Sequence, residues 1–244
     1  FSRARKARAR ATLGLGGALR AGLACAARFA APFTPRFAPA LMLALGLTLA
    51  GCATLEAPSG VRRLERGLPL GGEPLAAEWH IPATSPLEGL LVLQHGFSRR
   101  CDHLRGAASQ LAGEGWAVLC VNARLAGGAP GLATDLAAAI AGNTVTLPSG
   151  RALPARVVAA GHSAGGHFAV VLGAALARRD PARLAGVLLF DPVAASGFEP
   201  ALREVAARGV PVRALLAPPG PCNARRNIAR PWAAVASDGS RTGV

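Results

Sequence analysis

A serine stands between two glycines in the segment Gly161-His162-Ser163-Ala164-Gly165, which follows the apolar run RVVAA and opens an alanine-rich stretch. A G-x-S-x-G segment between a strand and a helix is typical of a serine nucleophile held on a sharp, strained turn. The glycines are required because such a turn brings backbone segments too close together for a Cβ. The pattern predicts Ser163 as a nucleophile, and a plain N-cap role at the helix start is the alternative.

A second candidate segment, Gln94-His95-Gly96-Phe97, ends an earlier apolar run. A serine that attacks a carbonyl needs N–H donors for the negative oxygen that develops on the substrate. We expect the backbone N–H groups of Phe97 and Ala164 to be these donors, because one follows an early strand and the other follows the nucleophile. The two segments together predict an acyl-transfer site with an oxyanion hole.

The elements that must position these residues alternate between short apolar runs and longer helical stretches, which is the rhythm of a parallel sheet with helical crossovers. Most of the apolar runs are continuous, as expected of strands covered on both faces. We expect strands at residues 77–81, 90–94, 116–122, 156–160, 186–190 and 210–217. We expect helices at residues 102–113, 131–141, 164–179 and 199–207. The predicted fold class is α/β, a three-layer sandwich with a mostly parallel sheet.

These motifs resemble those of the α/β-hydrolase superfamily, and within it those of chlorophyllase-like and dienelactone-hydrolase-like serine esterases. The resemblance covers about residues 90–223 and includes FDPV at 190–193, which is similar to the chlorophyllase segment that carries the triad acid. It implies that Asp191 orients the catalytic base. A turn role remains the alternative, because Asp-Pro is favoured in turns of any protein. From residue 211 onward, the only carboxylate side chain is that of Asp238, so the sequence offers few rivals to Asp191 as the acid.

The base that the resemblance implies is a histidine after the last strand, which accepts the proton of the serine hydroxyl. All five histidines precede Asp191, and we expect them to be structural or site-lining: His80, His95, His103, His162 and His167. The 27 residues after Ala217 carry too little pattern for a further helix, a last strand and a histidine loop. We therefore expect the last strand and the histidine loop to be missing from a chain that is truncated or shifted in frame.

Residues 1–52 predict a basic arm followed by an export signal. The stretch 37–50 is uncharged, and it is shorter than the roughly 20 apolar residues of a membrane span and typical of a signal-peptide core. The residues LAGC at 49–52 resemble a bacterial lipobox, which implies acylation of Cys52. We expect an exported, membrane-anchored lipoprotein that faces the periplasm or the cell exterior. An ordinary secretory signal or a short membrane anchor is the alternative.

The domain organisation that follows is a linker at residues 53–75, rich in Pro and Gly, and a hydrolase domain at 76–244. With 51% hydrophobic residues in 244, one ordinary core can be buried, which excludes intrinsic disorder. The net charge of +14 falls largely in residues 1–36, which hold eight basic residues and no acid. The remainder has 19 basic and 13 acidic residues, so we do not expect nucleic-acid binding.

Three cysteines lie in the body, at Cys101, Cys120 and Cys222. An odd number permits one disulfide among them. Cys101 and Cys222 each follow an expected strand, so their loops are expected at one end of the sheet, and a Cys101–Cys222 disulfide is one hypothesis. Reduced, buried cysteines are the other. No metal-ligand spacing or phosphate-binding loop is present, and no cofactor is expected.

The predicted function is hydrolysis of a small-molecule carboxylic ester through an acyl-enzyme on Ser163, with Asp191 as the acid. The activity of this chain stays open, because no histidine follows the acid. The alternative is a noncatalytic lipoprotein that binds a hydrophobic ester or a lipid in the same pocket.

Overall fold

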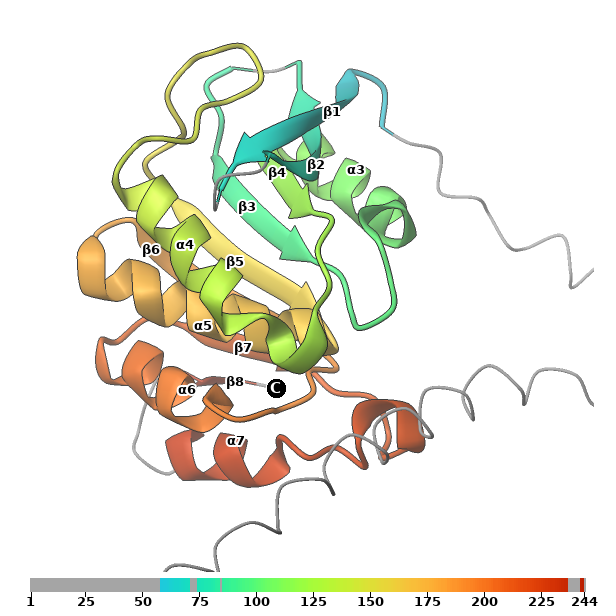
Figure 1. The fold of residues 1–244 in the computed structure, drawn as a ribbon, viewed down its shortest axis with the longest axis vertical. Helices are drawn as coiled ribbons and strands as arrows, with labels where there is room; N and C mark the ends of the chain where they lie inside the picture. Colours follow the sequence, from blue (N-terminus) through green and yellow to red (C-terminus); the bar gives the residue numbers. More distant parts are fainter. Residues whose placement is uncertain (1–57, 71–73, 84, 237–241, 244) are drawn as a thin grey trace, which may run out of the picture.

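A single sheet organises the part of the chain that the structure describes, with strand order β1-β2-β4-β3-β5-β6-β7-β8 (Figure 1). The computed structural model describes residues 58–70, 74–83, 85–236 and 242–243. The strands are β1 (Val61–Pro69), β2 (Pro74–Pro82), β3 (Gly89–Gln94), β4 (Trp116–Val121), β5 (Val157–His162), β6 (Leu184–Phe190), β7 (Val212–Leu215) and β8 (Thr242–Gly243). Strand β2 is antiparallel to β1 and β4, and all other neighbours are parallel. The predicted mostly parallel sheet is confirmed.

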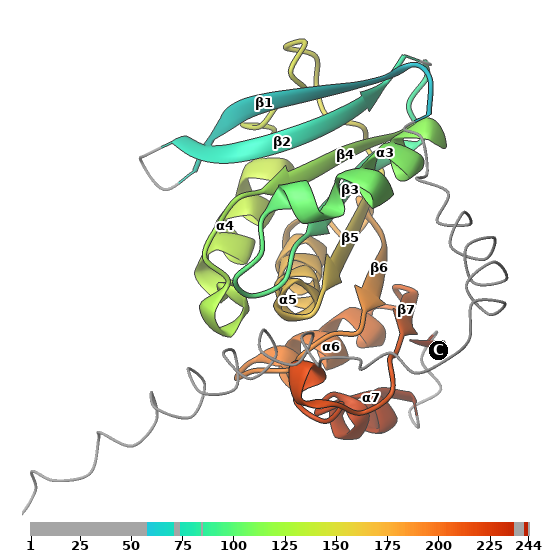
Figure 2. The ribbon, with the colours of Figure 1, turned by 90° about the vertical axis from the view of Figure 1, so that its right-hand side faces the viewer.

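The helices lie on both faces of this sheet, as the edge-on view shows (Figure 2). They are η2 (Cys101–Leu104), α3 (Arg105–Gly113), η3 (Ala126–Gly128), α4 (Pro130–Ala141), α5 (Ala164–Arg179), α6 (Phe198–Ala207), η4 (Pro221–Asn223) and α7 (Ala229–Ala236). Helix α3 covers one face, where Ala108 and Ala112 pack with Leu91, Leu93 and Val118. Helices α4, α5 and α6 share the larger core of the opposite face. The three-layer α/β sandwich is therefore confirmed.

Helix α5 is the centre of the larger core, because it packs between α4 and α6 against the sheet. Phe168, Leu172 and Leu176 recur at four-residue spacing on this helix and are fully buried. Strand β5, which precedes it, lies between β3 and β6. The carboxyl ends of these parallel strands meet at one edge of the sheet, so the loops that follow them are brought together there.

Two expectations about the ends of the domain are wrong. Residues 61–69, expected within the linker 53–75, form the edge strand β1, whose side chains are mostly exposed and therefore lack an apolar run. The expected loss of the last strand is also corrected, because α7 follows β7 and the two-residue strand β8 pairs in parallel with β7. A Thr-Gly pair is too short to carry a strand pattern in the sequence.

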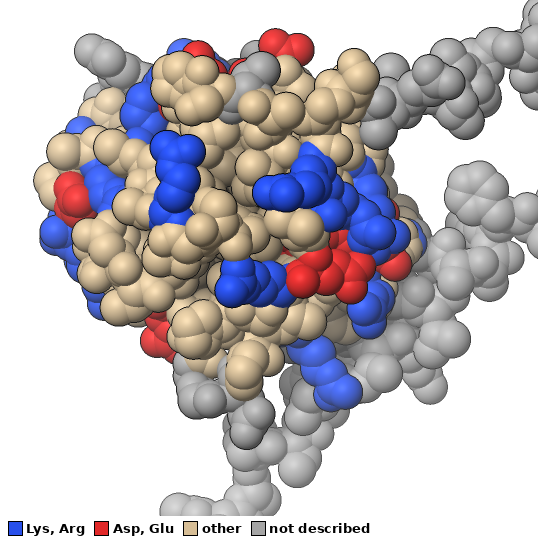
Figure 3. Space-filling model, turned by 90° about the horizontal axis from the view of Figure 1, so that it is seen from above, with Lys and Arg blue, Asp and Glu red and all other residues tan. Residues whose placement is uncertain are grey.

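The predicted export segment, including Cys52, lies outside the described residues. Within the described part of the chain, no helix combines the length and the apolar character needed to cross a membrane. Basic and acidic side chains are interspersed on the face shown in Figure 3. Ion pairs among the described residues include Arg63 with Glu65 on β1 at 2.9 Å and Arg178 with Glu204 between α5 and α6.

Candidate functional site

Ser163 stands on the turn that joins β5 to α5, as predicted. Strand β5 ends at His162 and the helix begins at Ala164. The serine has φ 56° and ψ −121°, a backbone conformation that costs a non-glycine residue about 1–3 kcal/mol. It is half-buried, and its side chain makes no N-cap hydrogen bond to the helix. This geometry is that of a strained turn that presents a hydroxyl, and it differs from an ordinary N-cap.

The glycines around Ser163 are required by close backbone contacts. A Cβ on Gly161 would overlap the carbonyl group of Gly165, and a Cβ on Gly165 would overlap the carbonyl oxygens of Gln94 and His95. No rotation of a side chain can relieve an overlap with backbone atoms. The turn therefore needs glycine at both flanking positions of the motif and packs directly on the end of β3.

The 94–97 segment, which was expected to supply an oxyanion donor, lies against the serine. A Cβ added to Gly96 would stand 3.1 Å from the Cβ of Ser163. Neither the N–H of Phe97 nor that of Ala164 forms a hydrogen bond with another described residue. Two unused amide donors on the two segments that meet at Ser163 are the elements from which an oxyanion hole is built.

Two buried side chains fix this loop. The Gln94 amide donates to the carbonyl of Val121 at 2.7 Å, and its oxygen accepts the N–H of Val121 at 3.4 Å, which continues the β3–β4 ladder through a side chain. His95 is buried, and its Nδ1 lies 2.8 Å from the carbonyl oxygen of Gly96. Burial lowers the pKa of His95, so the ring is neutral and Nδ1–H donates to that carbonyl.

Asp191 follows β6 directly and lies beside the serine turn. The N–H of Ser163 donates to the carbonyl of Phe190 at 3.0 Å, and the N–H of Val193 donates to the carbonyl of Ser163 at 3.1 Å. The Oδ1 atom of Asp191 accepts the N–H of Ala217 at 3.1 Å and the side-chain amide of Asn223 at 3.0 Å. Asp191 is itself strained, at φ 44°. The structure thus brings Ser163, Asp191 and the Gly96 loop to one edge of the sheet.

No histidine forms a hydrogen bond with Ser163 or Asp191 in the described part of the chain. His162 is exposed, with its Nδ1 beside Gly96. Protein atoms around the ring partly desolvate it and lower the pKa of His162, Asp191 acts in the opposite direction, and Arg99 lowers the pKa further. His167 is fully buried on α5, where its ring packs edge-on against Phe198. Ser163 and Asp191 therefore lie at one edge of the sheet with no hydrogen-bonded imidazole between them among the described residues.

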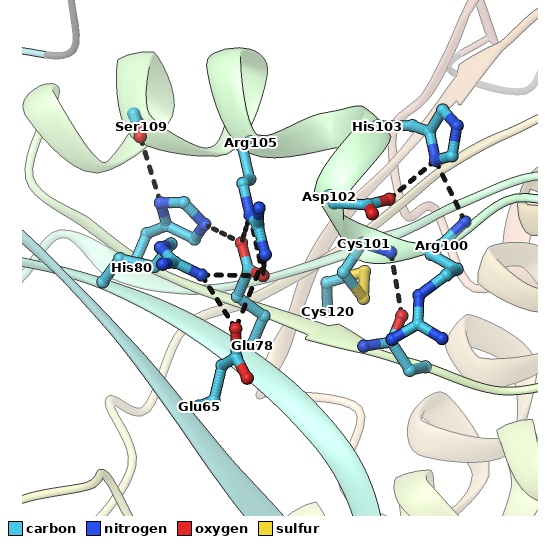
Figure 4. Close-up of polar contacts among 12 residues, drawn as sticks. Glu65, Glu78, His80, Arg100, Cys101, Asp102, His103, Arg105, Ser109 and Cys120 are labelled. Carbon is cyan, nitrogen blue, oxygen red and sulfur yellow. Dashed lines mark hydrogen bonds and ion pairs between the residues drawn. A yellow bond between two sulfur atoms is a disulfide. The ribbon is translucent and has the colours of Figure 1, made fainter.

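A disulfide joins Cys101 to Cys120 (Figure 4). The hypothesis of a Cys101–Cys222 bond is wrong. Cys120 lies on β4, and its Cα is 5.7 Å from that of Cys101, a spacing that suits a disulfide. The backbone N–H of Cys101 also donates to Asn122 Oδ1 at 2.9 Å. These contacts attach the segment after the Gly96 loop to the neighbouring strand.

A buried polar cluster on the α3 face was not predicted from the sequence (Figure 4). The Nδ1 of His80 lies 3.1 Å from Ser109 Oγ, and its Nε2 lies 2.9 Å from Glu78 Oε1. The Arg105 guanidinium donates to both oxygens of Glu78, at distances between 2.8 and 3.0 Å. Burial acts to raise the pKa of Glu78, but these hydrogen bonds outweigh it and the pKa is lowered.

The cluster has the serine, histidine and carboxylate of a triad, yet its environment is that of a structural network. Ser109 and His80 are both buried between α3 and the sheet, so a substrate has no access to the hydroxyl. Burial lowers the pKa of His80 despite the neighbouring carboxylate. The signal in the sequence was a Glu and a His two residues apart on a predicted strand, which places both on one face.

No group of three or more His, Cys, Asp or Glu side chains that could hold a metal ion is found in the described ranges. No protein-family model and no curated protein matches this chain.

Several solved structures match most of this chain. An esterase from Pyrobaculum calidifontis has a TM-score of 0.58 and 19% identity, covering 95% of this chain and 88% of its own. Bacterial brefeldin A esterase has a TM-score of 0.56 and 18% identity, covering 92% and 82%. A Klebsiella pneumoniae protein assigned as a dienelactone hydrolase has a TM-score of 0.56 and 13% identity, covering 75% and 83%.

The sheet order, the strained serine turn and these likenesses define the class of fold. This chain has the α/β-hydrolase fold, as its motifs predicted. At these identities the likeness is one of fold. The chemistry of the site must be argued from its own residues.

Proposed function

We propose that this protein is a serine hydrolase that cleaves a carboxylic ester through an acyl-enzyme. The observation that carries the proposal is the strained turn at Ser163, which lies against the Gly96 loop with the N–H groups of Phe97 and Ala164 unused. Strain held at one hydroxyl beside two free donors has no evident structural benefit. It fits a group that attacks a carbonyl.

In the proposed reaction, Ser163 Oγ forms a bond to the carbonyl carbon of the ester, and its proton passes to a base. The N–H groups of Phe97 and Ala164 donate to the developing oxyanion. Expulsion of the alcohol, with a proton returned by the base, leaves the acyl group on the serine. Water then attacks the acyl-enzyme and releases the acid. Asp191 orients the base, and expected turnover is slow because Ser163 has no hydrogen-bonded histidine among the described residues.

The alternative is a noncatalytic protein that binds a hydrophobic ester or lipid at the same edge. Two observations favour it: the missing hydrogen-bonded base, and the exposure of two large apolar side chains beside the site. Phe97 follows β3 and is 55% exposed, and Leu215 ends β7 and is 65% exposed. Since β5 and β6 lie between β3 and β7 in the sheet, these two side chains flank Ser163 and Asp191.

A fluorophosphonate probe distinguishes the two proposals. We expect the folded protein to be labelled at Ser163, Ser163→Ala to lose the label, and Asp191→Asn to be labelled more slowly. A matched control is Ser98→Ala, which removes an exposed hydroxyl on the same loop as Phe97. A folded protein that takes no label, yet binds a hydrophobic ester in a calorimetric titration, would support the binding function instead.

We also propose that Cys52 is acylated and that the mature protein is anchored to a bacterial membrane, facing the periplasm or the cell exterior. The support is the uncharged stretch at 37–50 followed by LAGC. Mass spectrometry of the membrane fraction should find an acylated N-terminus at Cys52. In Cys52→Ala the anchor should be lost, and an unmodified N-terminus in the parent protein would contradict the proposal.

A further inference from the structure

Asn223 is a buried polar side chain that neither the motifs nor the proposed chemistry uses. It lies in η4, in the loop between β7 and α7, and is 3% exposed. A buried amide must have hydrogen-bond partners, because an unpaired polar group inside a protein is costly. The partners of Asn223 therefore indicate what it does.

All four hydrogen-bonding positions of this amide are used. Its oxygen accepts the N–H of Gly220 at 2.8 Å and that of Arg226 at 3.0 Å. Its nitrogen donates to the carbonyl of Pro218 at 3.0 Å and to Asp191 Oδ1 at 3.0 Å. Three of the bonds shape its own loop, and the fourth reaches the candidate acid.

The loop around Asn223 is held in a costly backbone conformation. Ala224, Arg225 and Arg226 have φ angles of 50°, 55° and 57° in succession. For residues with a Cβ the left-handed region costs about 1–2 kcal/mol each. The hydrogen bonds of the Asn223 oxygen hold this loop, and the loop in turn fixes the direction of the side-chain N–H.

The segment after β7 holds the carboxylate of Asp191 through hydrogen bonds to one of its two oxygens. The N–H of Ala217 and the amide of Asn223 both donate to Oδ1, and the N–H of Asp191 donates to the carbonyl of Leu215 at 2.7 Å. Within the described residues no donor bonds Oδ2. One oxygen is saturated and the other is available for the N–H of a base.

We propose that Asn223 is the positioning residue of the catalytic acid: its amide holds Asp191 Oδ1, so that Oδ2 is directed to the base that Ser163 needs. This assignment rests on the proposed hydrolase function. It does not make Asn223 a catalytic residue, because its contact is with Asp191 and not with the substrate. The role requires the N–H that faces Asp191, whereas the loop is held by the other three hydrogen bonds, two to the amide oxygen and one from the nitrogen to Pro218.

The variant Asn223→Asp keeps the bonds that the amide oxygen accepts and removes those that the nitrogen donates. It is almost the same size, and its carboxylate still accepts the N–H groups of Gly220 and Arg226. When ionised it donates neither to Asp191 nor to Pro218, and it repels the Asp191 carboxylate. Asn223→Ala removes all of these bonds. Asn227→Ala is the matched control, because the Asn227 side chain forms two hydrogen bonds to Ala194, in the loop after β6, and none to Asp191 among the described residues.

The experiment measures the fluorophosphonate labelling of Ser163 as a maximal rate and a half-saturating concentration, together with the thermal midpoint. We expect Asn223→Asp to lower the maximal rate about 100-fold, the scale for a catalytic group displaced by about 1 Å. The half-saturating concentration should stay unchanged, and Asn227→Ala should label at the parental rate. If Asn223→Ala does not fold, Asn223→Asp still decides the question.

Two results would overturn the proposal. The first is a folded Asn223→Asp that labels at the parental rate, which would leave Ser163 as an activated nucleophile and remove only the role of Asn223. The second is an equal loss of rate in Asn227→Ala, which would assign the effect to the loop as a whole. A parent protein that takes no label contradicts the hydrolase function itself, and the positioning role fails with it.

Discussion

Gly96 and Ser163 lie so close together that a Cβ on the glycine would stand 3.1 Å from the Cβ of the serine. The same added atom would lie 3.3 Å from Nδ1 of His162. These distances are tight but not prohibitive, so a side chain at 96 would displace the loop without preventing folding. The Phe97 N–H can therefore keep its position beside Ser163 only because residue 96 has no side chain.

Gly96→Ala should therefore impair the site more than the fold. We expect the rate of Ser163 labelling to fall about 100-fold, the scale for losing one oxyanion donor, with a small change in the denaturant midpoint. Gly106→Ala is the control, because an added Cβ there meets nothing within 4 Å and a helix gains about 0.5–1 kcal/mol. Unchanged labelling in Gly96→Ala would remove Phe97 from the oxyanion hole.

Gly165→Ala should damage the fold itself. The added Cβ would overlap the carbonyl oxygens of Gln94 and His95, which are backbone atoms of a buried segment. We expect a loss of about 3 kcal/mol or more in the free energy of unfolding, measured by urea denaturation. Gly131→Ala on α4, where an added Cβ meets nothing within 4 Å, should be neutral or stabilising. Equal stability of the two variants would contradict the close packing of the turn on β3.

The Cys101–Cys120 disulfide should stabilise the loop that follows Phe97. The bond closes a segment of 19 residues, which corresponds to about 3 kcal/mol in the chain-entropy account of disulfides. The double variant Cys101→Ala/Cys120→Ala should lose about this much in urea denaturation and label more slowly at Ser163. A non-reduced digest of the parent protein should contain the cross-linked peptide, and its absence would contradict the assignment.

Most of the fold could be predicted from the sequence, because the central strands are buried on both faces and read as continuous apolar runs. The six expected strands correspond to β2 through β7, and the four expected helices to η2 with α3 and to α4, α5 and α6. Strand β1 was missed because an edge strand with exposed Arg and Glu carries no such run. The Thr-Gly pair of β8 is too short to form a pattern.

The site could be predicted only where its chemistry is local. The turn at Ser163 and the loop at Gly96 depend on short segments with glycines at fixed positions, and the structure places them in contact. The pairing of Cys101 with Cys120 and the bond from Asn223 to Asp191 depend on contacts between separate elements. No spacing in the sequence encodes those contacts, so they required the structure.

Acidification should destabilise this protein from about pH 6.5 downward. Burial lowers the pKa of His80 in the folded protein. In the unfolded chain His80 binds a proton near its ordinary pKa of 6.5, whereas in the folded protein the ring stays neutral at that pH. The stability that the neutral ring supports is thus present above that pH and is lost as pH falls. Glu78 acts in the same direction, because its lowered pKa favours the folded state above about pH 4.5.

The measurement for this prediction is the urea midpoint of the protein between pH 8 and pH 5. The variant His80→Gln should show a weaker dependence on pH, because it removes one group that must remain neutral in the folded state. His103→Gln is the control, since His103 is exposed and lies beside Asp102. A midpoint that stays constant from pH 8 to pH 5 would contradict the buried neutral histidine.

His167→Leu should raise stability while weakening the acid dependence. The ring of His167 is fully buried, and neither of its nitrogens has a hydrogen-bond partner among the residues that the structure describes. A buried polar group without a partner costs about 1–3 kcal/mol, so an apolar side chain of similar size should recover part of that cost at pH 8. The ring packs against Phe198 and lies so close to Gly128 that an added Cβ there would stand 2.6 Å from the ring.

Urea denaturation of His167→Leu and the parent at pH 8 and pH 5 provides the measurement. A loss of more than about 1 kcal/mol at pH 8 would instead show that the imidazole nitrogens have a bonded partner in solution.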